Sequence, residues 1–187
     1  MTPDPLSLVK FSLADPVAAG RALLALNPPM PVRWMLLAAA VSTSVLLLYL
    51  GPAVMGDLSA LPPPLGFLGL QAVMNLVVIG LITRVGRAFG GQDDFAGALW
   101  LVGWMQWITV VFLIAQIVAI LLVPVLNMPV AMLSVMMSIW VLVGYICALH
   151  GFRSRLAVLA MMILVFLSFS VFLSMVLTLL GVDPTGA

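Results

Sequence analysis

The polar stretch RVGRAFGGQDDFA, from Arg84 to Ala96, separates two long apolar runs and decides how the chain folds. Two arginines end the run before it, Gly90 and Gly91 give a turn signal, and Asp93 and Asp94 open the run after it. Helix C-termini favour cations, the turns that follow them favour glycine, and helix N-termini favour carboxylates. The stretch therefore predicts a tight turn between two helices.

Composition places most of the chain in lipid. The protein has 187 residues, of which 65% are hydrophobic and only 7% are charged, whereas soluble domains carry roughly 25% charged residues. The net charge of +1 is too small for a nucleic-acid-binding surface, so we expect no nucleic-acid partner. Pro3, Asp4 and Pro5 interrupt the start of the chain, where a secretory signal would need a basic and then an apolar region, so we expect the N-terminus to be retained.

The apolar runs predict an all-α fold, an integral membrane five-helix transmembrane bundle that forms one domain over residues 1–187. A run of about 20 apolar residues crosses a bilayer as a helix, and five runs come close to or exceed that length. The predicted spans are residues 32–50, 66–83, 95–123, 130–150 and 155–180. The segment 51–65 is predicted as a loop, because it contains glycine, aspartate and three consecutive prolines.

A shorter helix is predicted at residues 15–26, within an N-terminal segment 1–31. Asp15 is a candidate N-cap and Pro16 suits the first helical position, while Asn27-Pro28-Pro29 ends the helix. It is too short to cross a bilayer. Because Arg21 lies beside leucines, we expect an amphipathic helix in the plane of the headgroups.

The basic residues give the orientation. All seven fall before or at the start of the first span, between the second and third spans, or between the fourth and fifth spans up to the first residue of the fifth: Lys10, Arg21, Arg33, Arg84, Arg87, Arg153 and Arg155. With five spans these segments lie on one side, which the positive-inside rule makes cytoplasmic. The sequence thus predicts a cytoplasmic N-terminus and a periplasmic C-terminus.

The chain resembles the Yip1 domain family over about residues 10–182. The resemblance is carried by the Phe89-Gly90-Gly91 turn with Asp93-Asp94-Phe95, by Trp100, Trp104 and Trp107 in the third span, and by Ala148-Leu149-His150-Gly151-Phe152-Arg153 at the end of the fourth. It implies a five-span fold with the N-terminus in the cytoplasm. The richness in Ala, Leu and Val and the single lysine suggest a bacterial member in the inner membrane.

The resemblance also bears on function. Eukaryotic members are associated with membrane traffic and prenylated small GTPases, and carry a longer cytosolic N-terminal region. This chain lacks that region, so we do not expect GTPase binding. The resulting expectation is a non-enzymatic multi-pass membrane protein that acts through protein partners or lipid organisation at its cytoplasmic face, with membrane lipids, other membrane proteins or itself as partners. The alternatives are a small transporter or lipid-translocating protein, and an accessory subunit of a larger membrane complex.

Seven residues are candidate cytoplasmic contacts for a partner or for headgroups: Arg84, Arg87, Asp93, Asp94, His150, Arg153 and Arg155. The arginines could bind anionic headgroups, although most membrane proteins have basic cytoplasmic loops without any specific lipid site. The two aspartates could hold a divalent cation, but helix capping and pairing with arginine explain them with fewer assumptions. We therefore predict no metal site.

The predicted spans contain no charged side chain in their interior, and proton-coupled transporters and channels usually have one there. The polar groups that remain include four amides, Gln71, Asn75, Gln106 and Gln116. Such groups most often hydrogen-bond helices together; alternatively, these four line a polar crevice.

Nothing in the sequence favours catalysis. Cys147 and His150 are three residues apart on a predicted helix and could touch, yet a buried thiol and an imidazole at a helix C-terminus explain them equally. We expect no enzymatic activity and no cofactor. The stripe formed by Trp100, Trp104 and Trp107 predicts an aromatic belt or packing against the second span. Gly144, Ala148 and Gly151 predict a close helix contact, within the chain or with another copy.

Overall fold

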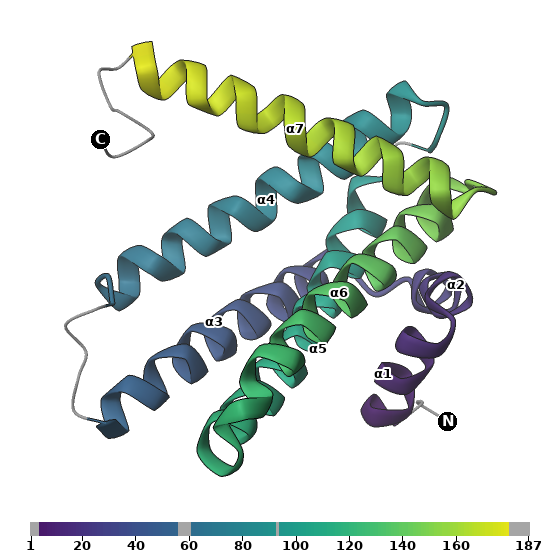
Figure 1. Cartoon of the computed structure of the whole chain (residues 1–187). Helices are drawn as coiled ribbons and strands as arrows, with labels where there is room; N and C mark the ends of the chain where they lie inside the picture. The colour runs from purple at the N-terminus through teal and green to yellow at the C-terminus, as the bar shows by residue number, and fades with distance from the viewer. Residues whose placement is uncertain (1–3, 56–60, 93, 180–187) are drawn as a thin grey trace. The chain divides into compact units, whose positions relative to one another are not determined.

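The structure is a computed structural model that describes residues 4–55, 61–92 and 94–179. This part of the chain is all-α and contains no strand. Two short helices, α1 (Pro5–Ala14) and α2 (Pro16–Leu26), precede the long helices (Figure 1). Among the described residues five helical segments are long and apolar enough to cross a membrane, which confirms the predicted five-helix membrane fold.

The long helices are α3 (Met30–Met55), α4 (Pro64–Ala88), α5 (Phe95–Leu122), α6 (Asn127–His150) and α7 (Arg155–Leu179), and the 3₁₀ turn η1 (Pro124–Leu126) leads into α6. By their contacts, the residues divide into two compact units, Met1–Phe152 and Arg153–Ala187. The first unit holds α1 to α6. The second unit holds α7.

Several helix limits differ from the prediction. Helix α3 continues past Gly51 and contains Pro52, where a loop was predicted. A proline removes one backbone hydrogen bond, and lipid strongly favours keeping the others within the helix. Helix α4 continues to Ala88, five residues beyond the predicted end at residue 83, so Arg84 and Arg87 lie on its last two turns. The N-terminal segment also contains a complete helix, α1, before the one predicted there.

The predicted helix caps are present. Asp15 Oδ1 accepts a hydrogen bond from the Ala18 amide at 3.3 Å, and Asn27 ends α2 in a left-handed conformation with φ of 40°. At the start of α5, Asp94 Oδ1 accepts a hydrogen bond from the Gly97 amide at 2.8 Å. These carboxylates satisfy amides that the first turn of a helix leaves unpaired.

Close packing in the first unit is concentrated at one end, which we call the closed end. It consists of α2, the first turns of α3 and α5, and the last turns of α4 and α6. The buried core lies here and includes Leu23, Leu37, Leu99, Tyr145 and Leu149. Glycine permits this packing, because a Cβ atom added at Gly20 would lie 2.8 Å from Ala148 Cβ, and one at Gly103 would lie 3.3 Å from Leu36 Cδ2.

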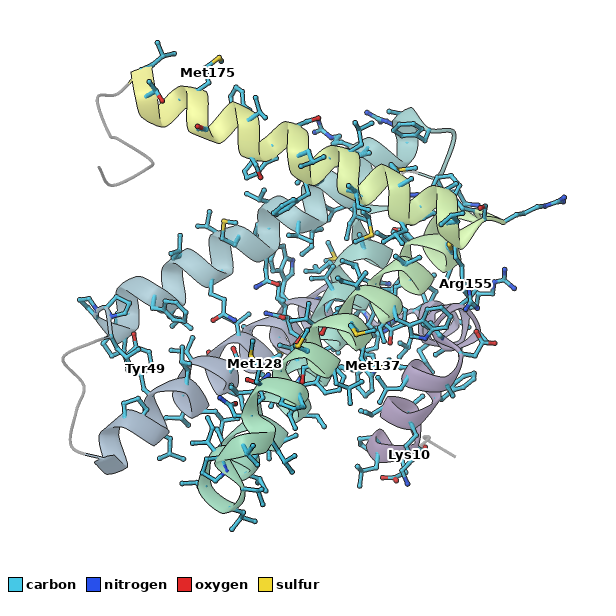
Figure 2. All side chains as sticks on the ribbon, viewed as in Figure 1. Lys10, Tyr49, Met128, Met137, Arg155 and Met175 are labelled. Atoms are coloured by element: carbon cyan, nitrogen blue, oxygen red, sulfur yellow. The ribbon has the colours of Figure 1, made fainter. Side chains whose placement is uncertain are left out.

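The opposite end of the first unit, which we call the open end, packs loosely. It comprises residues 46–50, 64–76, 111–122 and 127–138 of α3 to α6, and most of their described side chains are exposed to the surroundings of the protein. A Cβ atom added at Gly66 or Gly69 of α4 would meet no protein atom within 4 Å, in contrast to the glycines of the closed end. The hydroxyl of Tyr49, labelled in Figure 2, donates a hydrogen bond to Pro62 O at 2.5 Å beside the start of α4.

Candidate functional site

His150 connects α6 to α4 and to the turn between α4 and α5 at the closed end. Its Nδ1 lies 2.7 Å from Gln92 O, and its Nε2 lies 3.1 Å from Ile82 O. The ring fits against Gly86 and Gly91, where a Cβ atom would overlap it. The imidazole therefore fixes the turn between α4 and α5.

This position differs from the surface role predicted for His150. The side chain is only 5% exposed and both its ring nitrogens face backbone carbonyls of α4 and the turn, so it is a structural support rather than an outward contact. Its ring also lies beside that of Phe152, with the two planes tilted by 35° and a centroid distance of 5.4 Å. Sequence reasoning placed His150 correctly at the end of a helix but could not identify the carbonyls opposite it.

The predicted charged contacts of the first unit lie around this turn. Arg84 and Arg87 are exposed on α4, and Asp94 is half-buried at the start of α5. Asp93 lies outside the described residues. Arg153 and Arg155 belong to the second unit, Arg153 exposed and Arg155 half-buried, and their place beside Arg84 and Arg87 stays a prediction.

A second polar cluster, which the sequence analysis missed, holds α1 against α5 and α6. Ser12 Oγ accepts hydrogen bonds from Tyr145 Oη at 2.8 Å and from Trp104 Nε1 at 3.3 Å. It also donates to Leu8 O at 2.8 Å. Ser12 is fully buried, and the three bonds satisfy its hydroxyl. Trp140 Nε1 adds a bond to Leu13 O at 3.2 Å.

Helix α2 is held in the same way. Trp100 Nε1 donates to Leu23 O at 2.8 Å, and Gly144 of α6 lies directly against Pro16. Two residues of the tryptophan stripe, Trp100 and Trp104, therefore bond the N-terminal helices, a contact that the predicted belt or packing against the second span did not include. The small-residue stripe of α6 makes its close contact within this chain, through Gly144 and Ala148. The interfacial location of α2 stays a prediction.

Arg33, which the sequence places at the start of a span, is buried with 7% of its side chain exposed. Its Nε donates to Pro28 O at 2.8 Å and its Nη2 to Asn27 Oδ1 at 2.6 Å. The guanidinium thus closes the turn between α2 and α3 at the C-terminal end of α2, where a cation is favoured by the helix dipole. Together with the indole bond from Trp100, it holds α2 in the closed end.

The predicted intramembrane amides separate into two groups. Gln71 and Gln116 line a cavity between α3, α4, α5 and α6, and its other polar lining residues are Ser44, Thr109, Ser134 and Ser138. Gln71 Nε2 donates to Ser44 Oγ at 3.0 Å and joins α4 to α3, as the interhelical-bond alternative predicts. Asn75 and Gln106 do not line the cavity; Asn75 Nδ2 donates to Gln71 O at 2.8 Å.

This cavity has a volume of about 360 Å³. Sequence spacing could have indicated its hydroxyl groups, because Ser134 and Ser138 are four residues apart and share a face of α6. It could not have shown that this face meets that of Thr109 and Gln116 on α5. Among the described residues no three His, Cys, Asp or Glu side chains come together as metal ligands.

Comparison with family models, curated proteins and solved structures found no match to this chain. The five long apolar helices define the class of the protein as a multi-pass α-helical membrane protein. Any narrower assignment depends on the residues themselves.

Proposed function

We propose that this protein is a non-enzymatic multi-pass membrane protein of the Yip1 type that binds anionic lipid headgroups at its closed end, on the cytoplasmic side of a bacterial inner membrane. The observation that carries the proposal is the position of Arg84 and Arg87. Both side chains are exposed on the last turns of α4. The helix they belong to is held at the turn by the buried His150.

Fixed arginines are suited to this role. A guanidinium group binds phosphate through paired hydrogen bonds, and an arginine near an anionic leaflet contributes about 1 kcal/mol of attraction. Rigid support lowers the entropy lost when a headgroup is held. The packing of His150 against Gly86 and Gly91 supplies that support.

The distribution of basic residues along the chain supports a cytoplasmic location for the closed end. The seven basic residues lie in the connecting segments, or at the ends of the helices beside them, that five spans place on one side, and the positive-inside rule makes that side cytoplasmic. Lys10 and Arg21 on the docked N-terminal helices are exposed as well. They extend the set of cations beyond the α4–α5 turn.

The test is lipid retention by the full chain in mild detergent, measured by native mass spectrometry with phosphatidylglycerol and, separately, phosphatidylcholine. The double variant R84E/R87E should lose the preference for phosphatidylglycerol, because two favourable terms of about 1 kcal/mol each amount to a factor of about 30 in affinity. The matched variant R84K/R87K keeps both charges and should retain most of the preference. An unchanged preference in R84E/R87E would refute the proposal. An affinity pull-down from the same membranes would show whether a protein partner uses this face instead.

A further inference from the structure

The cavity at the open end contains two polar side chains without a protein partner. Gln116 on α5 and Ser138 on α6 both line it, and within the described chain neither makes a hydrogen bond. The other polar lining groups are bonded: Thr109 Oγ1 donates to Met105 O at 3.2 Å and Ser134 Oγ to Val130 O at 2.7 Å. A hydrogen-bonding group left unpaired in hydrocarbon is costly. A molecule bound in the cavity would supply the hydrogen bonds that the two groups lack within the described residues.

The lining restricts the chemistry of that partner. None of the twelve lining residues carries a charge, and the apolar ones include Phe67, Phe112 and Leu113. A phosphate or ammonium group would stay without a counter-charge there, which hydrocarbon strongly disfavours. The lining instead suits a molecule with an uncharged hydroxyl or carbonyl at one end and hydrocarbon at the other.

The position of the cavity favours entry from the bilayer. Gln116 lies six residues before the end of α5 at Leu122, so the amide is about 9 Å inside that helix end. Val135 and Ile139 line the cavity and are 60% and 42% exposed, so its wall is in contact with the surroundings. Its volume of about 360 Å³ falls within the range of small-molecule sites, about 300–1,000 Å³, and exceeds the roughly 30 Å³ of one water.

We propose that this cavity binds one uncharged amphipathic lipid of the diacylglycerol class, with its hydroxyl or ester groups on Gln116 and Ser138 and an acyl chain against Phe67 and Phe112. The free amide has donors and an acceptor and the serine hydroxyl has both functions, so a hydroxyl next to an ester carbonyl satisfies them together. The site lies apart from Arg84 and Arg87, and binding there requires no charge on the lipid.

The experiment uses the full chain in nanodiscs that contain a diazirine-bearing diacylglycerol, or a phosphatidylcholine with the same diazirine chain. After illumination, peptides are sequenced to locate the label. We expect diacylglycerol to label residues 109–116 and 134–139, and unlabelled diacylglycerol to compete. The phosphatidylcholine probe should label these segments about tenfold less.

The chain offers a matched control. Gln106 is an amide on the same helix that also makes no hydrogen bond within the described residues, but it does not line the cavity. Q116L/S138A should reduce the diacylglycerol labelling about tenfold, as expected for two lost hydrogen bonds, whereas Q106L should leave it unchanged. Q116M provides a second variant of similar side-chain volume if the first fails to give monodisperse protein.

Three results would overturn the proposal. Equal labelling by the two probes would mean that any acyl chain enters the cavity and its polar groups select nothing. Diacylglycerol labelling that persists in Q116L/S138A and Q116M would place the lipid elsewhere, and absence of labelling from both segments would leave only water as the partner of Gln116 and Ser138.

Discussion

Replacing Gly144 with alanine should push the N-terminal helices away from α6. A Cβ atom at this position would lie 2.6 Å from Pro16 Cγ and 3.1 Å from the Pro16 carbonyl carbon. The proline ring has no rotamer that moves it aside, so the contact is relieved only when α2 shifts as a body. Restoring an ordinary carbon–carbon separation of about 3.5–4.0 Å requires a shift of about 1 Å.

The change in the free energy of unfolding caused by Gly144→Ala is the sum of two opposing contributions. Overpacking costs about 1–3 kcal/mol, while alanine in place of a helical glycine gains about 1 kcal/mol. Gly144→Ala should therefore be neutral to destabilising by about 2 kcal/mol. Gly69→Ala on α4 is the matched control, because no protein atom lies within 4 Å of its Cβ position. Gly69→Ala should have only the gain from the higher helix propensity of alanine, and should stabilise the protein by up to about 1 kcal/mol.

Thermal unfolding of both variants in the same detergent gives the comparison, and hydrogen–deuterium exchange of residues 5–26 shows where the change occurs. We expect faster exchange of α1 and α2 in Gly144→Ala only. Should Gly144→Ala raise the unfolding midpoint as much as Gly69→Ala does, with unchanged exchange, α2 does not lie on α6 at this distance and our account of the closed end is wrong.

Three further predictions test other parts of the structure. Trp100→Phe removes the indole donor to Leu23 O and should lower the free energy of unfolding by about 1 kcal/mol, measured by thermal unfolding. The indole nitrogen of Trp107 is buried without a partner in the described chain, so Trp107→Phe should cost less stability. A larger loss in Trp107→Phe than in Trp100→Phe would contradict the hydrogen bond assigned to Trp100. Asp94→Ala should cost about 0.5–2 kcal/mol through loss of the α5 cap, while Asp94→Asn keeps most of it; equal stability of the two variants would argue against capping. A reporter active only in the periplasm, fused after the last residue, should be active, and activity of a cytoplasmic reporter there would reverse the proposed orientation.

The spans and caps could be predicted because their signals are local. Apolar runs near 20 residues long have few alternatives to a membrane helix, and Asp15 and Asp94 each satisfy an amide three residues ahead. The helix limits were less predictable. The predicted second span ended at residue 83 and left out Arg84 and Arg87, yet a charged residue continues a helix as readily as an apolar one where the helix leaves hydrocarbon.

The hydrogen bonds that hold the N-terminal helices could not be predicted, because they join distant parts of the chain. Trp100 and Leu23 are 77 residues apart, and Tyr145 and Ser12 are 133 residues apart. Helical spacing shows which side chains share a face but not which helix that face meets. The same limit separated Gln71 and Gln116, which line the cavity, from Gln106, whose sequence context is equally apolar.

The uneven packing of the first unit has a physical cause in where the small residues lie. In lipid, helices associate through close packing and hydrogen bonds rather than through exclusion of water, so glycine at a contact decides how near two helices come. Gly20, Gly86, Gly97 and Gly144 meet side chains across the closed end, whereas Gly69 of α4 meets none. The open end thus lacks the contacts that would seal it, and its amide and hydroxyl groups stay available. Gln116 is one of these groups, and the proposed lipid would supply the hydrogen bond that its amide lacks within the described residues.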